Sequence, residues 1–238
     1  MLVLGGGPAG ASAAVYSARK GLRVAIIAER IGGQVKETVG IENLISVPRT
    51  TGSQLADPLR THIEHYPIEI FEDRKIERAE LQGKEKKVFS GGGETFTAPA
   101  VIIATGASWR KLNVEEKAGS LPNVEIFTSS QTTRVTGDGE KVTGIRIKDR
   151  ITNEERDYPL DGIFVQIGLA ANSAPFRDAL ETTPTGEIKT DAFCRTTLPG
   201  VYAAGDVSDV PYKQIVIAMG EGAKAALSAF DDRIRGIA

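Results

Sequence analysis

The glycine-rich turn near the N-terminus constrains what this chain can fold into more than any other feature of the sequence. Gly5, Gly7 and Gly10 have the spacing G-x-G-x-x-G, which alone is only a weak indication of nucleotide binding. Here a short apolar run precedes the turn, an alanine-rich stretch ending at Gly21 follows it, and residues 22–28 form a second apolar run. Strand, turn, helix and strand in this order predict one βαβ unit.

Each position in the turn has a physical reason. Gly5 permits the tight turn, Gly7 lets the backbone approach a pyrophosphate, and Gly10 lets the helix pack closely on the sheet. The N-terminus of the helix offers N–H groups and partial positive charge to phosphates. Glu29, at the end of the second strand, would accept hydrogen bonds from ribose hydroxyls. The predicted dinucleotide contacts in this unit are Gly5, Gly7, Pro8, Ala9, Gly10, Glu29 and Arg30; the alternative is a plain glycine turn.

Further elements follow from hydrophobic patterning and from turn residues. In the first predicted helix beyond this unit, Asp57 is an N-cap with Pro58 at the first helical position, or else Pro58 kinks the helix. The expected elements are a helix over 53–66, short strands from 68 to a buried strand at 101–104, a β-meander over 124–160 with turns at 137–139 and near Asn153, buried strands at 163–167 and 200–204, and a long helix over 213–234.

Two later segments distinguish FAD from NAD as the dinucleotide. Ala104-Thr105-Gly106 follows one buried strand, and the decapeptide at 197–206, which ends in Gly205-Asp206, contains another. Together with the glycine-rich turn they resemble the three-part FAD signature of flavoprotein reductases that have two dinucleotide-binding domains. The resemblance implies that Asp206 binds the ribityl chain of FAD; without it, Gly205-Asp206 would merely cap a helix.

The segments 32–34, 41–43, 164–168 and 211–215 narrow the resemblance to the thioredoxin reductase-like flavoproteins, nearest to the flavoprotein subunits of alkyl hydroperoxide reductases. The likeness covers nearly the whole chain. It implies that a backbone group near Ala79 meets the adenine, and that the segment from Lys213 to Ile215 directs a helix N-terminus at the N1–C2=O edge of the flavin, where reduced flavin carries negative charge. The FAD contacts that the resemblance implies are Gly33, Gln34, Asn43, Ala79, Thr105, Gly106, Gly205, Asp206, Lys213, Gln214 and Ile215.

The chain departs from this family in one large respect. Those reductases carry a second βαβ unit for NAD(P)H and a C-x-x-C pair after the Ala-Thr-Gly segment, and the hydroperoxide reductase subunits carry a thioredoxin-like region at the N-terminus. This chain passes from residues 109–114 to 121–124 through a few polar residues. We therefore expect an engineered or otherwise shortened chain, although a natural short homologue would show the same pattern.

The expected fold class is α/β: a Rossmann-like FAD-binding domain with a central parallel sheet and attached antiparallel β-meanders. We expect residues 1–117 to form the first segment of the FAD-binding domain. Residues 118–160 would form a joint and a β-meander retained from the nicotinamide domain, and residues 161–238 the second segment of the FAD-binding domain.

Composition excludes several other classes of function. The single cysteine, Cys194, rules out an intramolecular disulfide and is read as a structural thiol, and the two histidines, His62 and His65, as surface residues. We predict neither a metal site nor a catalytic side chain. A net charge of −2 gives no general attraction to nucleic acid or anionic lipid. The absence of a long apolar run and of a signal peptide predicts a cytoplasmic protein that is not in the membrane.

Three hypotheses of function remain open. The first is an FAD-binding module whose flavin is reduced by a small-molecule donor or under light and is reoxidised by a small-molecule acceptor or oxygen. Such a module does not oxidise NAD(P)H efficiently. The second is a compact NAD(P)H- or ferredoxin-dependent flavoprotein reductase with an unrecognised donor site. The third is a non-catalytic module that forms a homodimer through the FAD-domain surface. A simple NAD-dependent dehydrogenase is a distant fourth, because it gives the decapeptide before Asp206 no role.

Overall fold

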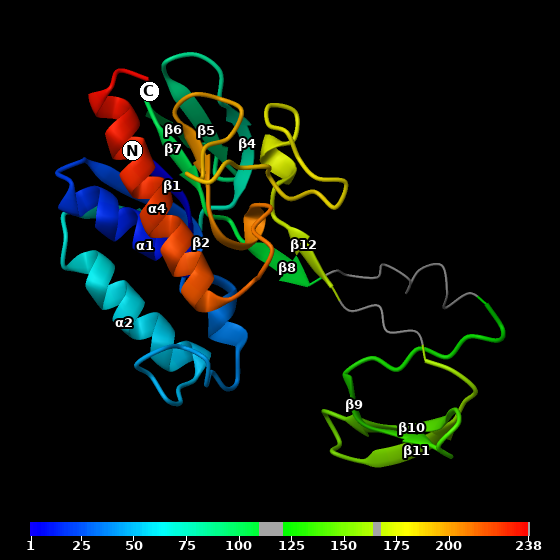
Figure 1. Cartoon of the computed structure of the whole chain (residues 1–238). Helices are drawn as coiled ribbons and strands as arrows, with labels where there is room; N and C mark the ends of the chain where they lie inside the picture. Colours follow the sequence, from blue (N-terminus) through cyan, green and yellow to red (C-terminus); the bar gives the residue numbers. More distant parts are fainter. Residues whose placement is uncertain (110–120, 164–167, 238) are drawn as a thin grey trace. The chain divides into compact units, whose positions relative to one another are not determined.

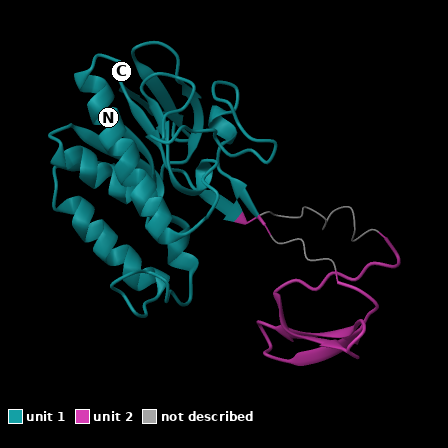
Figure 2. Ribbon diagram, in the orientation of Figure 1, with its two compact units in different colours: residues 1–108, 169–238 teal, residues 109–168 magenta. Residues whose placement is uncertain are grey.

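The computed structural model of the chain describes residues 1–109, 121–163 and 168–237 (Figure 1). They form two compact units. Unit 1 contains Met1–Ser108 and Leu169–Ala238, and unit 2 contains Trp109–Gly168 (Figure 2). Four residues of the strand expected at 163–167, and most of the polar joint around 113–122, lie outside the described residues.

The centre of unit 1 is a five-stranded parallel sheet in the order β13-β7-β1-β2-β3. Leu2–Leu4 of β1 lie opposite Ala25–Ile27 of β2 on one side and Val101–Ile103 of β7 on the other. Because the strands are parallel, the segments that follow β1, β7 and β13 all leave the same edge of the sheet. The strands are β1 (Leu2–Gly6), β2 (Val24–Ile31), β3 (Ile68–Phe71), β7 (Val101–Ile103) and β13 (Val201–Ala203).

Two hydrophobic cores cover the two faces of this sheet. Alternate strand residues such as Val3, Ile26 and Ile102 pack with α1 and α4 on one face. Their neighbours Leu4 and Ile103 pack on the other face with the antiparallel sheet β4-β5-β6, as the two-residue period of a strand requires. Figure 1 shows the helices on one side and β4–β6 on the other. These elements are α1 (Pro8–Arg19), α2 (Gly52–Glu64), α4 (Ile215–Ile234), β4 (Ile76–Glu80), β5 (Lys86–Ser90) and β6 (Thr95–Ala98).

The helix ends follow from local sequence, with two corrections to the predicted bounds. In α2 the N-cap is Thr51 rather than Asp57: Thr51 and Gln54 form a reciprocal capping box, and Pro58 lies inside the helix. The last helix begins at Ile215 rather than at Lys213, because Gln214 has an extended backbone. The predicted end of α1 is confirmed, since Gly21 follows its C-cap with a positive φ of 76°.

Shorter elements complete unit 1, of which β8 ends one residue beyond the boundary at Ser108. Strands β8 and β12 pair with each other, and three 3₁₀ turns follow β2, β12 and β13. Among the described residues, no helix is both long enough and apolar enough to cross a membrane. The bounds are β8 (Ala107–Trp109), β12 (Leu169–Ala171), η1 (Gly33–Glu37), η2 (Ala174–Phe176) and η3 (Gly205–Val207).

Unit 2 contains the antiparallel sheet β11-β10-β9. Its strands are β9 (Ser130–Gly137), β10 (Val142–Asp149) and β11 (Glu155–Pro159). The carboxylate of Asp138 accepts hydrogen bonds of 2.9 Å from the N–H groups of Glu140 and Lys141, which closes the first turn. Asn153, with a φ of 62°, lies in the second turn. The predicted meander and the predicted fold class are both confirmed.

Candidate functional site

Of the three glycines in the G-x-G-x-x-G spacing, the fold requires Gly5 and Gly10 but not Gly7. A Cβ on Gly5, whose φ is 109°, would lie 2.2 Å from the carbonyl oxygen of Ala104, and a Cβ on Gly10 would lie 1.9 Å from that of Gly5. A Cβ on Gly7 would meet no protein atom within 4 Å. Packing within the protein therefore explains Gly5 and Gly10, whereas the space beside Gly7 is open to a ligand.

The N-terminus of α1 begins beside this open space. Gly7 is the N-cap and has no side chain to cap the helix, Pro8 is the first helical residue, and the first turn contains no acidic residue. The first N–H groups and the positive end of the helix dipole thus remain for an anion. The open space beside Gly7 and this helix N-terminus together fit a ligand that carries a pyrophosphate.

The segment after β2 returns to the same turn. The N–H of Gly32 donates to the carbonyl of Gly6 at 2.8 Å, and a Cβ on Gly33 would lie 3.0 Å from the Cα of Gly7. Gln34, in η1, is half-buried. Glu29 and Arg30 at the end of β2 are exposed, and Arg30 forms an ion pair with Glu37.

The turn after β13 packs against the first turn of α1. A Cβ on Gly205, whose φ is 75°, would lie 2.9 Å from the Cβ of Ala9 and 3.4 Å from that of Ala218. A Cβ on Gly222 would lie 2.1 Å from the carbonyl oxygen of Ala9. Ala9 therefore lies where α1, α4 and the turn after β13 converge. The side chain of Asp206 leaves this turn half-buried, and burial raises the pKa of its carboxyl, an effect that the charge of Lys213 opposes.

The N-terminus of α4 is a second helix end without a side-chain cap. Gln214 is the N-cap, Ile215 is the first helical residue, and the first turn contains no acidic residue. The side chain of Gln214 instead accepts a hydrogen bond of 2.8 Å from the amide of Asn43. This contact joins two predicted site residues that are 171 positions apart in the sequence.

Thr105 and Gly106 are held by a residue that the sequence did not reveal. Asn172 donates its side-chain amide to the carbonyl of Thr105 at 2.9 Å, and its own carbonyl accepts from the Thr105 hydroxyl at 2.8 Å. The backbone N–H of Asn172 donates to the carbonyl of Gly106, and Ser108 donates to the Asn172 side chain. The only signal in the sequence is a polar residue directly after the short apolar run that forms β12.

Ala79 stands apart from the residues that meet around Ala9. It lies in β4 opposite Val88, and it packs against the core on the β4–β6 face of the parallel sheet. Two backbone hydrogen bonds connect the start of that segment to the end of β2: the N–H groups of Asp73 and Arg74 donate to the carbonyls of Glu29 and Ala28.

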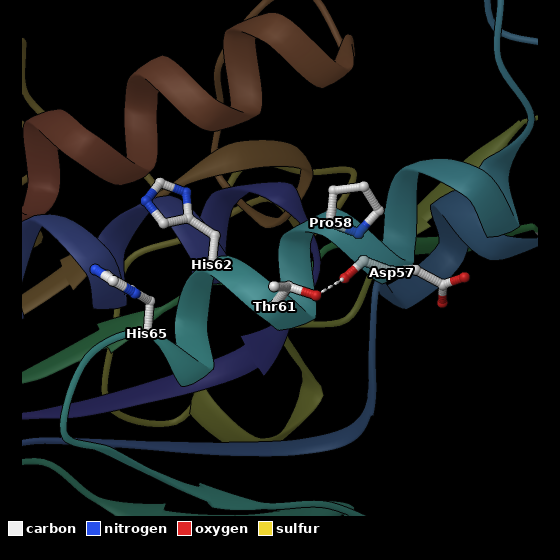
Figure 3. Close-up of a pocket in the computed structure, with 5 residues that line it drawn as sticks. All are labelled: Asp57, Pro58, Thr61, His62 and His65. Atoms are coloured by element: carbon white, nitrogen blue, oxygen red, sulfur yellow. Dashed lines mark hydrogen bonds between the residues drawn. The ribbon is translucent and has the colours of Figure 1, made fainter.

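The histidines and the cysteine do not form a reactive site. His62 and His65 lie with Asp57 and Thr61 along an open depression on α2, where both imidazoles are exposed (Figure 3). Among the described residues, no cluster of His, Cys, Asp and Glu could hold a metal ion. Cys194 is buried and donates to the carboxylate of Glu221 at 3.1 Å, and burial together with this contact raises the pKa of the thiol far above its usual value. Cys194 is therefore a structural residue.

Comparisons with known proteins identify the family that this chain resembles. The profile of the family described as pyridine nucleotide-disulphide oxidoreductase matches residues 1–123 and residues 114–222. The alkyl hydroperoxide reductase F subunit of Pseudomonas putida is 42% identical over 305 residues, which cover 99% of this chain and 58% of that protein. The corresponding protein of Escherichia coli K12 is 38% identical over 303 residues, with the same coverage. This chain thus spans 58% of the length of these relatives.

Solved structures show the same likeness. The thioredoxin reductase of T. acidophilum is 28% identical, covers 98% of both chains and superposes with a TM-score of 0.75. That of Streptococcus pyogenes is 25% identical, with a TM-score of 0.75, and covers 98% of this chain and 97% of its own. The resemblance that the sequence indicated is confirmed. The Pseudomonas alignment is 305 residues long against the 238 of this chain, so the aligned range of that relative contains residues that this chain lacks.

Proposed function

Because this chain belongs to the pyridine nucleotide-disulphide oxidoreductase family, we propose that unit 1 binds FAD and serves as an electron-exchange module. Its electron donors and acceptors are small molecules, oxygen among them. The observation that carries the proposal is the convergence around Ala9 of the uncapped N-terminus of α1, of α4 and of the turn that bears Asp206; α4 also begins without a side-chain cap. Bound FAD would supply two-electron and one-electron redox chemistry.

Different residues at the carboxyl ends of the parallel strands would bind different parts of FAD. Gly7 and the first N–H groups of α1 take the pyrophosphate, and Glu29 accepts hydrogen bonds from the adenosine ribose. Asp206 accepts hydrogen bonds from the ribityl hydroxyls. The backbone N–H groups at the start of α4, near Ile215, would face the N1–C2=O edge of the flavin, where they would stabilise the negative charge of its reduced form.

The pairing of Asn43 with Gln214 supports this arrangement from outside the parallel sheet. It holds the loop after η1 against the N-cap of α4 with a hydrogen bond of 2.8 Å. Two amide side chains held in this way offer fixed donors and acceptors to the polar edge of an isoalloxazine ring. We therefore assign both residues, with Gly33, Gln34, Thr105 and Gly106, to the flavin side of the site.

The chain is not expected to use NAD(P)H efficiently. Its sequence contains one G-x-G-x-x-G segment and one cysteine. The two ranges that match the family profile overlap at residues 114–123, where the longer relatives would place the additional residues of the alignment. We assign residues 118–160 to a joint and a β-meander that remains of the nicotinamide domain. The sequence offers no second glycine-rich segment of this kind to hold the nicotinamide ring against the flavin, so hydride transfer would lose the rate advantage of positioning.

An anaerobic reduction experiment tests this function. The FAD-reconstituted protein is illuminated with EDTA in one cuvette and mixed with NADH or NADPH in two others, and the flavin absorbance is followed. We expect bleaching by light and only slow, non-saturating bleaching by the nucleotides. Readmitted oxygen should restore the band. Rapid, saturable bleaching by one nucleotide would instead establish a compact reductase with its own donor site.

A further inference from the structure

The turn that carries Asp206 is fixed by Ser208. The backbone N–H and the hydroxyl of Ser208 both donate to the carbonyl of Gly205, at 2.9 and 2.8 Å, and Ser208 is fully buried. These two bonds close η3 and define the direction in which the Asp206 side chain leaves the turn. Half-burial of a carboxyl group favours its neutral form, which would donate a hydrogen bond to a hydroxyl and accept less strongly from it.

Lys213 is held against the same turn. Its ammonium donates to the backbone carbonyl of Ser208 at 2.6 Å, and the side chain is half-buried. The charge thus lies at a defined place, beside the carbonyl of the second residue after Asp206, and it favours the ionised form of that carboxyl. If the lysine side chain only projected into solvent, salt and water would screen its charge, and its ammonium would have no fixed position.

The other charged groups of this region are engaged elsewhere. The charge of Lys213 also lowers the pKa of Glu187, but the carboxylate of Glu187 accepts hydrogen bonds from the hydroxyls of Thr183 and Thr185. Asp209 accepts from the N–H and the hydroxyl of Thr190. The positive end of α4, which begins at Ile215, adds to the effect of Lys213.

We propose that Lys213 is a positioning residue: anchored to the Ser208 carbonyl, it keeps Asp206 ionised, so that Asp206 accepts hydrogen bonds from the sugar-chain hydroxyls of the cofactor. An ionised acceptor forms bonds about twice as strong as a neutral one. This inference rests on the proposed function, because it concerns how the same site holds FAD. Lys213 acts through Asp206 and does not itself have to contact the cofactor.

The test is the pH dependence of FAD binding, measured as the dissociation constant from flavin fluorescence between pH 4 and pH 8. In the wild-type protein the affinity falls as the pH drops through the pKa of Asp206. Lys213→Gln and Lys213→Met remove the charge and should move this midpoint upward by about one pH unit. Lys213→Arg should leave the midpoint in place, and Asp206→Asn should abolish it. Lys189→Met, which removes an exposed lysine paired with Glu181, is the matched control and should leave it unchanged.

The results separate this inference from the proposed function. Melting temperatures of the FAD-free variants show which of them are folded. If one of Lys213→Gln and Lys213→Met is unfolded, the other provides the test. A shifted midpoint in a folded Lys213 variant, with Lys213→Arg unshifted, supports the inference. Wild-type binding of FAD with an unshifted midpoint in Lys213→Gln and Lys213→Met overturns it and leaves the proposed function standing. Failure of the wild-type protein to bind FAD overturns the proposed function itself.

Discussion

Replacement of Gly7 by alanine separates the needs of the ligand from the needs of the fold. Gly7 has φ −75° and ψ −174°, which any residue adopts, and the added methyl group meets no protein atom within 4 Å. Loss of a glycine at such a position stabilises a protein by about 0.4–1 kcal/mol through the unfolded chain. Alanine is a poorer N-cap than glycine, which costs a similar amount, so we expect FAD-free Gly7→Ala to melt close to the wild-type temperature.

The same methyl group should weaken FAD binding. It lies on the open side of the glycine-rich turn, in the space that we assign to the pyrophosphate. We expect the dissociation constant for FAD to rise at least tenfold, a loss of about 1.4 kcal/mol. Fluorescence titration with FAD gives the affinity, and thermal unfolding without FAD gives the stability.

Two further alanine variants are the controls. Gly10→Ala would place its Cβ 1.9 Å from the Gly5 carbonyl oxygen, so we expect a loss of about 1–3 kcal/mol in folding free energy. Gly220→Ala fills open space on an exposed position of α4; it should add up to about 1 kcal/mol of stability and leave FAD affinity unchanged. Wild-type FAD affinity in a folded Gly7→Ala protein would refute the reasoning, as would a wild-type melting temperature for Gly10→Ala.

Other predictions concern charge and burial in unit 1. Burial raises the pKa of Asp206, so its ionisation costs stability as the pH rises through that pKa; Asp206→Asn should raise the melting temperature of the FAD-free protein at pH 7 but not at pH 4. The buried carboxylate of Asp232 accepts two bonds of 2.8 Å from Arg195 and one from the Tyr202 hydroxyl. Asp232→Asn should cost about 3 kcal/mol in urea unfolding at pH 7. Because Arg195 lowers the pKa of Asp232, that cost should be present above pH 4 and disappear as the pH falls through the lowered pKa. Ser17 has a buried hydroxyl with no partner among the described residues, so Ser17→Ala should stabilise by about 1 kcal/mol, and a destabilised variant in the same urea assay would contradict this.

Local patterning was enough to predict the central sheet and its glycine-rich turn. The apolar runs at 22–28, 101–104 and 200–204 became β2, β7 and β13 because each is buried on both faces, which makes such strands continuously apolar. Gly21 marked the end of α1, and the turns of the meander at 124–160 were visible as glycine, aspartate and asparagine.

Competing local signals and contacts between distant segments limited the prediction elsewhere. For α2, Asp57-Pro58 is as good a start signal as Thr51, and only the reciprocal bonds of Thr51 with Gln54 decide between them. The contacts of Asn172 with Thr105 join segments 67 residues apart, and no local pattern in the sequence specifies such a pairing. Side chains that tie distant loops together become recognisable only when the parallel sheet has placed the ends of its strands along one edge.

The most direct test of the central claim is equilibrium binding of FAD to the purified chain. Apoprotein is titrated with FAD while the visible spectrum and flavin fluorescence are recorded, and circular dichroism confirms that the chain is folded. We predict saturation at one FAD per chain, with a structured flavin band and a weaker affinity in Gly7→Ala. A folded chain that takes up no FAD would contradict the account. So would folded Gly7→Ala and Asp206→Asn variants that bind FAD as tightly as the wild-type protein.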